Sequence, residues 1–139
     1  MFKRILLAVD GSEHGQKAAA VAGEMTRRYA SELWVIVAYD PLPGYLGEPN
    51  LQAAIIHRLK QSEDIYIGAI EQIGIIPTTV HKEILEGPPA EAILAVANAR
   101  EVDLIIMGTR GLGRLAGALL GSQSQKVVGH AKCPVLLVR

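Results

Sequence analysis

Cysteine, aromatic residues and long hydrophobic runs are all scarce in this chain. The single cysteine, Cys133, excludes a framework of disulfide bonds within the chain, which favours a reducing compartment, and we expect a cytoplasmic protein. The first apolar run covers only residues 5–9 before Asp10 ends it, which is too short for a secretion signal or a membrane span. We therefore expect no membrane partner.

An excess of charge of one sign is also lacking, because 14 acidic residues balance 14 Lys and Arg residues. This balance disfavours a protein that binds nucleic acid through a global basic field. The four histidines lie on different predicted elements without metal-ligand spacing, so no metal site made by the protein is predicted. What is present is a chain of 139 residues, half of them apolar, which is enough for a single domain over residues 1–139.

Acidic residues are absent from the last 36 positions. Residues 1–103 carry all 14 acids and nine Lys or Arg residues, a net charge of −5, whereas residues 104–139 carry five basic residues and a net charge of +5. Six of the 14 glycines lie in this second segment. A glycine-rich segment without carboxylates suits an anion, because backbone amides can approach it and nothing repels it. Chance loss of acids from a short segment is the alternative.

Apolar runs of strand length alternate with helical patterns along the whole chain. The predicted strands cover residues 3–9, 32–39, 77–85, 103–107 and 134–138, and the third is polar enough for an edge strand. Four helices are predicted. The first begins after its N-cap Ser12, and the second covers residues 51–73 and ends at Gly74. The third begins at Pro88, and the last covers residues 122–131. The segment 40–50 between them is a loop, and either a lid or a plain surface excursion fits it.

Five strands joined by helical crossovers predict an α/β fold, a single doubly wound five-stranded parallel sheet of order 3-2-1-4-5 with helices on both faces. In this order the direction of winding switches between the first and fourth strands. Ligands of such sheets bind beyond the carboxyl ends of the strands at the switch point, which here means residues 10–12 and 107–109. The segment suited to an anion begins there.

The glycines of this segment match one phosphate-binding pattern better than two others. A Gly-Lys-Ser/Thr triplet is absent, and a match to G-x-G-x-x-A lacks the acid that a dinucleotide site needs about 20 residues later. The third pattern is Gly108-x2-Gly111-x9-Gly121-Ser122. Gly111 and Gly113 permit a tight turn lined by amides, and Ser122 is expected both to cap the last helix and to donate to a phosphate oxygen.

Four stretches of the chain resemble the universal stress protein family. They are ILLAVDGS at residues 5–12, EGPPA at 86–90, DLIIMGTRG at 103–111 and CPVLLV at 133–138. The glycine and serine spacing is similar to the motif of the ATP-binding branch of that family. The resemblance implies an α/β domain that binds ATP, usually forms a dimer and serves stress adaptation.

The resemblance also assigns roles by position. Asp10 would meet the adenosine or ribose side, Val37 and Ala38 with Met107 would line the adenine pocket, and the glycines with Ser122 would hold ribose and phosphates. Arg110 either clamps the phosphates or is an exposed loop residue. The complete set of expected nucleotide-binding residues is Asp10, Gly11, Ser12, Val37, Ala38, Met107, Gly108, Arg110, Gly111, Gly113, Gly121 and Ser122.

These observations predict a nucleotide-dependent stress-response or signalling module with little or no hydrolysis, whose cofactor is ATP, with or without Mg²⁺ or Mn²⁺. The alternative is a slow metal-dependent ATPase or phosphotransferase in which Asp10 coordinates the metal through the triphosphate. A purely structural dimerisation protein is a third reading. The last strand, residues 135–138, is apolar and has no helix after it, so we predict a homodimer with these strands at or near the contact.

Overall fold

The computed structural model describes residues 1–110 and 120–139, and strands and helices alternate through these residues. The strands are β1 (Arg4–Ala8), β2 (Glu32–Tyr39), β3 (Val80–Glu86), β4 (Leu104–Gly108) and β5 (Val135–Val138). The α-helices are α1 (Glu13–Tyr29), α2 (Asn50–Ile73), α3 (Pro89–Ala99) and α4 (Ser122–His130), and a short 3-10 helix, η1 (Gly44–Leu46), precedes α2.

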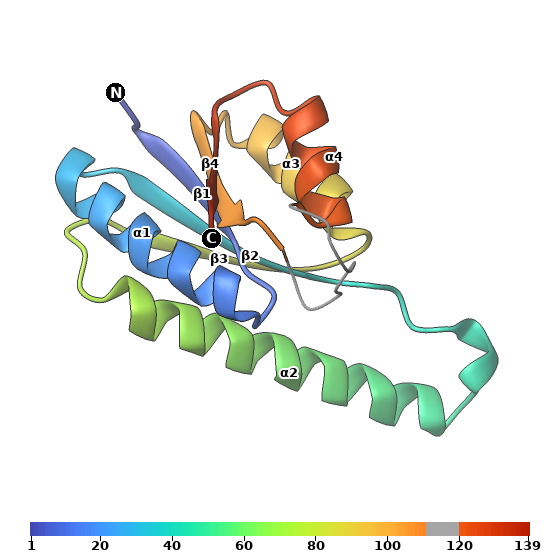
Figure 1. Cartoon of the computed structure of the whole chain (residues 1–139). Coiled ribbons are helices and arrows are strands. Elements are labelled where there is room, and N and C mark those ends of the chain that lie inside the picture. Colours follow the sequence, from blue (N-terminus) through green and yellow to red (C-terminus); the bar gives the residue numbers. More distant parts are fainter. Residues whose placement is uncertain (111–119) are drawn as a thin grey trace.

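The strands form one parallel sheet in the order β3-β2-β1-β4-β5, which confirms the predicted fold class and strand order. Leu6 of β1 is in register with Trp34 of β2 on one side and Ile105 of β4 on the other. The two halves of the chain therefore wind in opposite directions away from β1 (Figure 1).

Helices cover both faces of the sheet, and the side chains of β1 explain why. Ile5 and Leu7 belong to the apolar cluster under α1 and α2, whereas Leu6 between them belongs to the cluster under α3 and α4. All three are 0% exposed, because a strand alternates its side chains between two faces and here both faces are covered (Figure 1). This double burial produces the continuous apolar run in the sequence.

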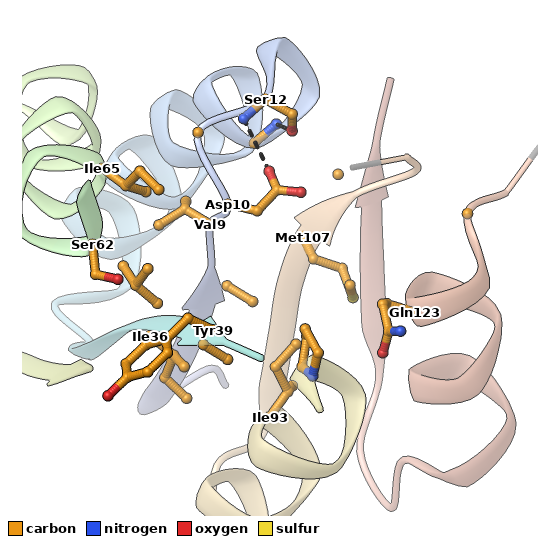
Figure 2. Close-up of a pocket in the computed structure, with 18 of the residues that line it drawn as sticks. Val9, Asp10, Ser12, Ile36, Tyr39, Ser62, Ile65, Ile93, Met107 and Gln123 are labelled. Atoms are coloured by element: carbon orange, nitrogen blue, oxygen red, sulfur yellow. Dashed lines mark hydrogen bonds between the residues drawn. The ribbon is translucent and has the colours of Figure 1, made fainter. Parts of the chain in front are cut away.

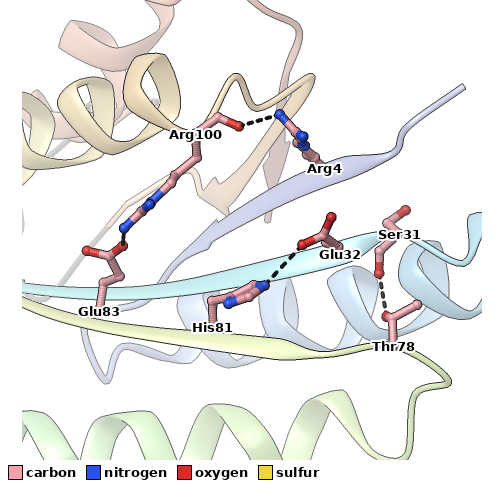
Figure 3. A network of polar contacts seen from close by, with 7 residues as sticks. All are labelled: Arg4, Ser31, Glu32, Thr78, His81, Glu83 and Arg100. Carbon is pink, nitrogen blue, oxygen red and sulfur yellow. Dashed lines mark hydrogen bonds and ion pairs between the residues drawn. The ribbon is translucent and has the colours of Figure 1, made fainter.

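The third strand starts three residues later than predicted and ends one residue later, at Val80–Glu86 rather than residues 77–85. The β-branched Thr78 does not join the strand because its hydroxyl donates to the carbonyl of Ser31, in the turn before β2 (Figure 3). Its side chain thus satisfies a loop carbonyl instead of extending the sheet. Propensity alone does not distinguish these two uses of threonine.

Polar side chains of β3 have partners on neighbouring elements, as Figure 3 shows. The ring of His81 stacks on Trp34 with 4.4 Å between centroids, and its Nε2 lies 3.1 Å from a carboxylate oxygen of Glu32. Glu83 accepts a hydrogen bond of 3.1 Å from Arg100 at the end of α3. A charged edge strand of this kind discourages pairing with other chains, and it covers the apolar Trp34.

The first half of α2 projects beyond the sheet together with η1 (Figure 1). None of the residues from 50 to 61 is buried, whereas Ser62, Ala69 and Ile73 are. Only the second half of the helix therefore packs on the molecule. Within residues 1–110 and 120–139, no helix combines the length and the apolar character that a membrane crossing needs.

Candidate functional site

The chain leaves β1 through a tight turn that leads directly into α1. Gly11 has a φ of +85°, a conformation that favours glycine, and a Cβ there would lie 3.1 Å from Ile65 of α2. A carboxylate oxygen of Asp10 accepts from the amide of Ser12 at 3.0 Å, and the Ser12 hydroxyl accepts from the amide of Gly15 at 3.1 Å. Ser12 is thus the N-cap of α1, as predicted.

The end of β4 packs against the beginning of α1. A Cβ on Gly108 would lie 2.7 Å from the Cβ of His14 and 3.0 Å from its carbonyl carbon, so only glycine allows this approach. One residue further, the Thr109 hydroxyl lies 2.8 Å from Nδ1 of His14. Gly108 therefore has a packing role that the motif alone did not indicate, and His14 forms the contact between α1 and the end of β4.

The beginning of α4 is held beside the same strand end. The amide of Gly121 donates to the carbonyl of Thr109 at 2.8 Å, and the buried hydroxyl of Ser124 donates to the carbonyl of Gly108 at 2.9 Å. The prediction that Ser122 caps this helix is wrong, because the N-cap is Gly121 and Ser122 is the first helical residue. With no side-chain cap, first-turn amides of α4 remain available to an anion.

A cavity of ≈ 710 Å³ lies at the carboxyl ends of β1, β2 and β4. Figure 2 shows Ser62 and Ile65 of α2 on one side of it, Ile93 of α3 and Gln123 of α4 on the other, and Asp10 between them. Of the predicted site residues, the following line the cavity: Asp10, Gly11, Ser12, Val37, Ala38, Met107, Gly108, Arg110, Gly121 and Ser122. Gly111 and Gly113, the other two, lie outside the described residues.

Two walls of the cavity were not predicted from the sequence. One is the buried half of α2, which contributes Ser62 and Ile65, and the other is the start of α3, which contributes Pro89 and Ile93. Neither helix carries a recognisable ligand motif. The doubly wound topology predicts only that strand ends meet there, and it does not give the length or tilt of the helices that close the sides.

A hydrogen bond across the last two helices fixes one of these walls. The side-chain oxygen of Gln123 in α4 accepts from the backbone amide of Ala90 at 2.9 Å, near the start of α3. The N-terminal ends of α3 and α4 are thereby joined at the rim of the cavity. Residue type and position gave no signal for this contact, because the partners are separated by 33 residues.

Charges of both signs line the cavity, with Arg58 and Arg110 as cations and Asp10, Asp40 and Asp64 as carboxylates. Arg110 is exposed, and so are Asp40 and Asp64. Within residues 1–110 and 120–139, no three His, Cys, Asp or Glu side chains come together as a metal site would require. The arrangement suits an organic anion with an apolar part better than a metal ion held by the protein alone.

Comparison with known proteins identifies the family of this chain. The sequence model of the universal stress protein family matches residues 1–139. The chain belongs to the universal stress protein family. A Thermus aquaticus relative, "Universal stress protein in QAH/OAS sulfhydrylase 3'region", is 50% identical over 139 residues, which are 100% of both chains.

Solved structures of the family share the fold. Universal stress protein UspA from Lactobacillus plantarum superposes with a TM-score of 0.87 at 25% identity, covering 99% of this chain and 98% of that one. A universal stress protein in complex with cAMP superposes with a TM-score of 0.69 at 26% identity, covering 99% of this chain and 97% of that one. Nucleotide binding is therefore present among the structural relatives of this chain.

Proposed function

We propose that this universal stress protein binds ATP and acts as a nucleotide-dependent stress-response or signalling module with little or no hydrolysis. The observation that carries the proposal is the convergence of predicted residues from β1, β2, β4 and α4 on one cavity of ≈ 710 Å³ at the switch point. That volume lies within the range of about 300–1,000 Å³ typical of small-molecule sites. The relative solved with cAMP supports a nucleotide as the ligand.

The two ends of the cavity suit the two ends of a nucleotide. Apolar side chains, among them Val37, Ala38 and Met107, line the part that would receive the base. The uncapped N-terminus of α4 and the loop arginine Arg110 lie where phosphates would sit, and both favour negative charge. Bound Mg²⁺ or Mn²⁺ would neutralise the triphosphate, and Asp10 is the carboxylate placed to hold it.

The position of Asp10 also supports the alternative of a slow metal-dependent ATPase or phosphotransferase. In-line phosphoryl transfer needs a positioned nucleophile as well as the metal. Among the described residues the cavity is lined by two further carboxylates, Asp40 and Asp64, and both are exposed at its rim. We therefore propose ATP binding without appreciable hydrolysis, and a measurement of ATP turnover distinguishes this function from a slow ATPase or phosphotransferase.

The deciding experiment is to denature the purified protein, identify any released nucleotide by chromatography and mass spectrometry, and titrate stripped protein with ATP. We expect stoichiometric ATP binding and turnover close to the buffer background with Mg²⁺ or Mn²⁺. Multiple turnovers well above background would establish the enzyme instead. A protein that releases no nucleotide and binds no added ATP would refute both functions.

A pair of variants in α4 tests the placement of the phosphates. Gly121→Leu puts a bulky side chain at the uncapped N-terminus of the helix, at a φ of −69° that any residue adopts. Gly129→Leu adds the same side chain near the other end of the helix, where a Cβ meets nothing within 4 Å. We expect ATP binding to be lost in the first variant and unchanged in the second. Equal affinities would show that the phosphates bind elsewhere.

The C-terminal strand supports a homodimer as the assembly of this module. Among the described residues β5 is an edge of the sheet that pairs with β4 on one side only, and its four residues are all partly exposed. An apolar edge strand is suited to pairing with a second copy. Sedimentation of a monomer at micromolar concentration would refute this assembly.

A further inference from the structure

Three buried serines line the cavity, each from a different helix. They are Ser12 at the N-cap of α1, Ser62 in α2 and Ser124 in α4, with exposed fractions of 8%, 2% and 3%. A buried hydroxyl is costly unless it is hydrogen-bonded, so the direction of its bond decides what it can offer a ligand. The Ser12 oxygen accepts from an amide, which does not use its proton. Ser62 and Ser124 both donate.

Ser62 presents an acceptor to the part of the cavity that would receive the base. Its hydroxyl donates to the carbonyl of Arg58 one turn earlier at 3.0 Å, which uses its only proton and leaves oxygen lone pairs. Figure 2 shows the side chain pointing from α2 toward Ile36 and Tyr39. Of the other polar residues of α2 that line the cavity, Arg58 is half-buried and Gln61 and Asp64 are exposed, so Ser62 is the fully buried polar side chain on this wall.

We propose that Ser62 is a specificity-determining residue that accepts a hydrogen bond from the exocyclic amino group of adenine. The proposal rests on the proposed function, since it names a contact within the same nucleotide site. A purine with a keto group at position 6, such as hypoxanthine or guanine, places an acceptor against this oxygen. To donate to that keto oxygen, the hydroxyl must give up its bond to Arg58. The site therefore favours the 6-amino purine.

The experiment compares ATP with inosine triphosphate, which differs from ATP in the base only by the replacement of the 6-amino group and the accompanying proton on N1. Dissociation constants are measured by equilibrium dialysis, and chromatography confirms that the nucleotides stay intact. In the unmodified protein we expect tighter binding of ATP. In Ser62→Ala we expect the preference to fall about three- to tenfold, the range that one neutral hydrogen bond supplies.

Ser124→Ala is the matched control. Ser124 is a serine of the same burial that also donates to a backbone carbonyl, but it lies near the proposed phosphates. We expect this variant to change the affinity for both nucleotides by the same factor and to keep their ratio. Ser62→Ala places a better helix former within α2, and its melting curve and circular dichroism check that it folds.

The outcomes separate the two proposals. An unmodified protein that binds neither nucleotide refutes the proposed function and this contact with it. Tight ATP binding with a ratio that Ser62→Ala leaves unchanged overturns the role of Ser62 and keeps the proposed function. A ratio that falls equally in Ser62→Ala and Ser124→Ala also overturns it, because the discrimination would then depend on general packing of the cavity.

Discussion

Replacing Gly108 with alanine should damage stability and nucleotide binding together. The residue ends β4, is buried and lines the cavity, and a Cβ there would lie 2.7 Å from the Cβ of His14. Carbon atoms in contact are normally about 3.5–4.0 Å apart. The first turn of α1 must therefore move away from β4 by about 1 Å, because the carbonyl carbon of His14 is also only 3.0 Å from the added atom.

The expected cost follows from that overlap. Forcing one methyl group into a packed site costs about 1–3 kcal/mol, which for a domain of this size lowers the melting temperature by about 3–15 °C. The same movement displaces the turn at Asp10 and the amides of α1 from the cavity. Loss of one hydrogen bond to a charged ligand costs about 1.5–3 kcal/mol, so we expect ATP affinity to fall about tenfold or more.

Gly23→Ala separates the two effects. A Cβ on Gly23 would lie 2.3 Å from the carbonyl oxygen of Ile73, where α1 crosses α2, and Gly23 does not line the cavity. We expect thermal melts to show destabilisation at least as large as in Gly108→Ala. Titration at a temperature where both variants are folded should show unchanged ATP affinity in Gly23→Ala. Full stability in Gly108→Ala, or equal affinity in both variants, would refute the reasoning.

Three further outcomes are expected. Gly68→Ala, in an α2 position where a Cβ meets nothing within 4 Å, should raise the free energy of unfolding by about 0.4–1 kcal/mol in denaturant titration, and a loss would show an unrecognised contact. Arg27→Met should lower the free energy of unfolding by about 0.5–1.5 kcal/mol, because the guanidinium donates to the carbonyls of Ile73 and Ile75 at 2.7 Å and 3.3 Å. An unchanged free energy would mean that water replaces both hydrogen bonds. Burial raises the pKa of the Cys133 thiol, so its alkylation at pH 8 should be slower than that of a free cysteine. The thiol of the unfolded chain loses its proton at a lower pH than the thiol of the folded chain, so the free energy of unfolding should fall as the pH rises above the unfolded pKa. Alkylation as fast as that of free cysteine would contradict it.

The strand order was predictable because each element carries its own pattern. Continuous apolar runs such as residues 3–9 require a strand covered on both faces, and right-handed crossovers leave few ways to order five of them. The cavity-lining residues at the ends of β1 and β4 followed from the same topology, whereas Val37 and Ala38 at the end of β2 were assigned through the family resemblance. Segment bounds were less accurate where one side chain had two possible uses, as for Thr78.

The helix walls of the site were not predictable from local pattern. Ser62 reads as one polar position on an amphipathic helix, and nothing in its neighbours distinguishes it from the exposed Gln61. Its proposed role depends on how α2 lies across the sheet, which is set by contacts such as that of Gly23 with Ile73 at the far end of the helix. The capping error at Ser122 arose in the same way, since the preceding glycine takes the N-cap position once Gly121 bonds to Thr109.

The sequence by itself determined the sheet, its order and the edge at which the cavity lies, because hydrophobic period and chain connectivity are local and topological properties. The spacing of its glycines and serine also gave the predicted phosphate site, and the family motif has a similar spacing. Only the tertiary structure decided that Gly108 is required by His14, that Gln123 joins α4 to α3, and that Ser62 turns an acceptor toward the cavity. These features depend on distances between residues remote in sequence, which packing of the whole molecule sets.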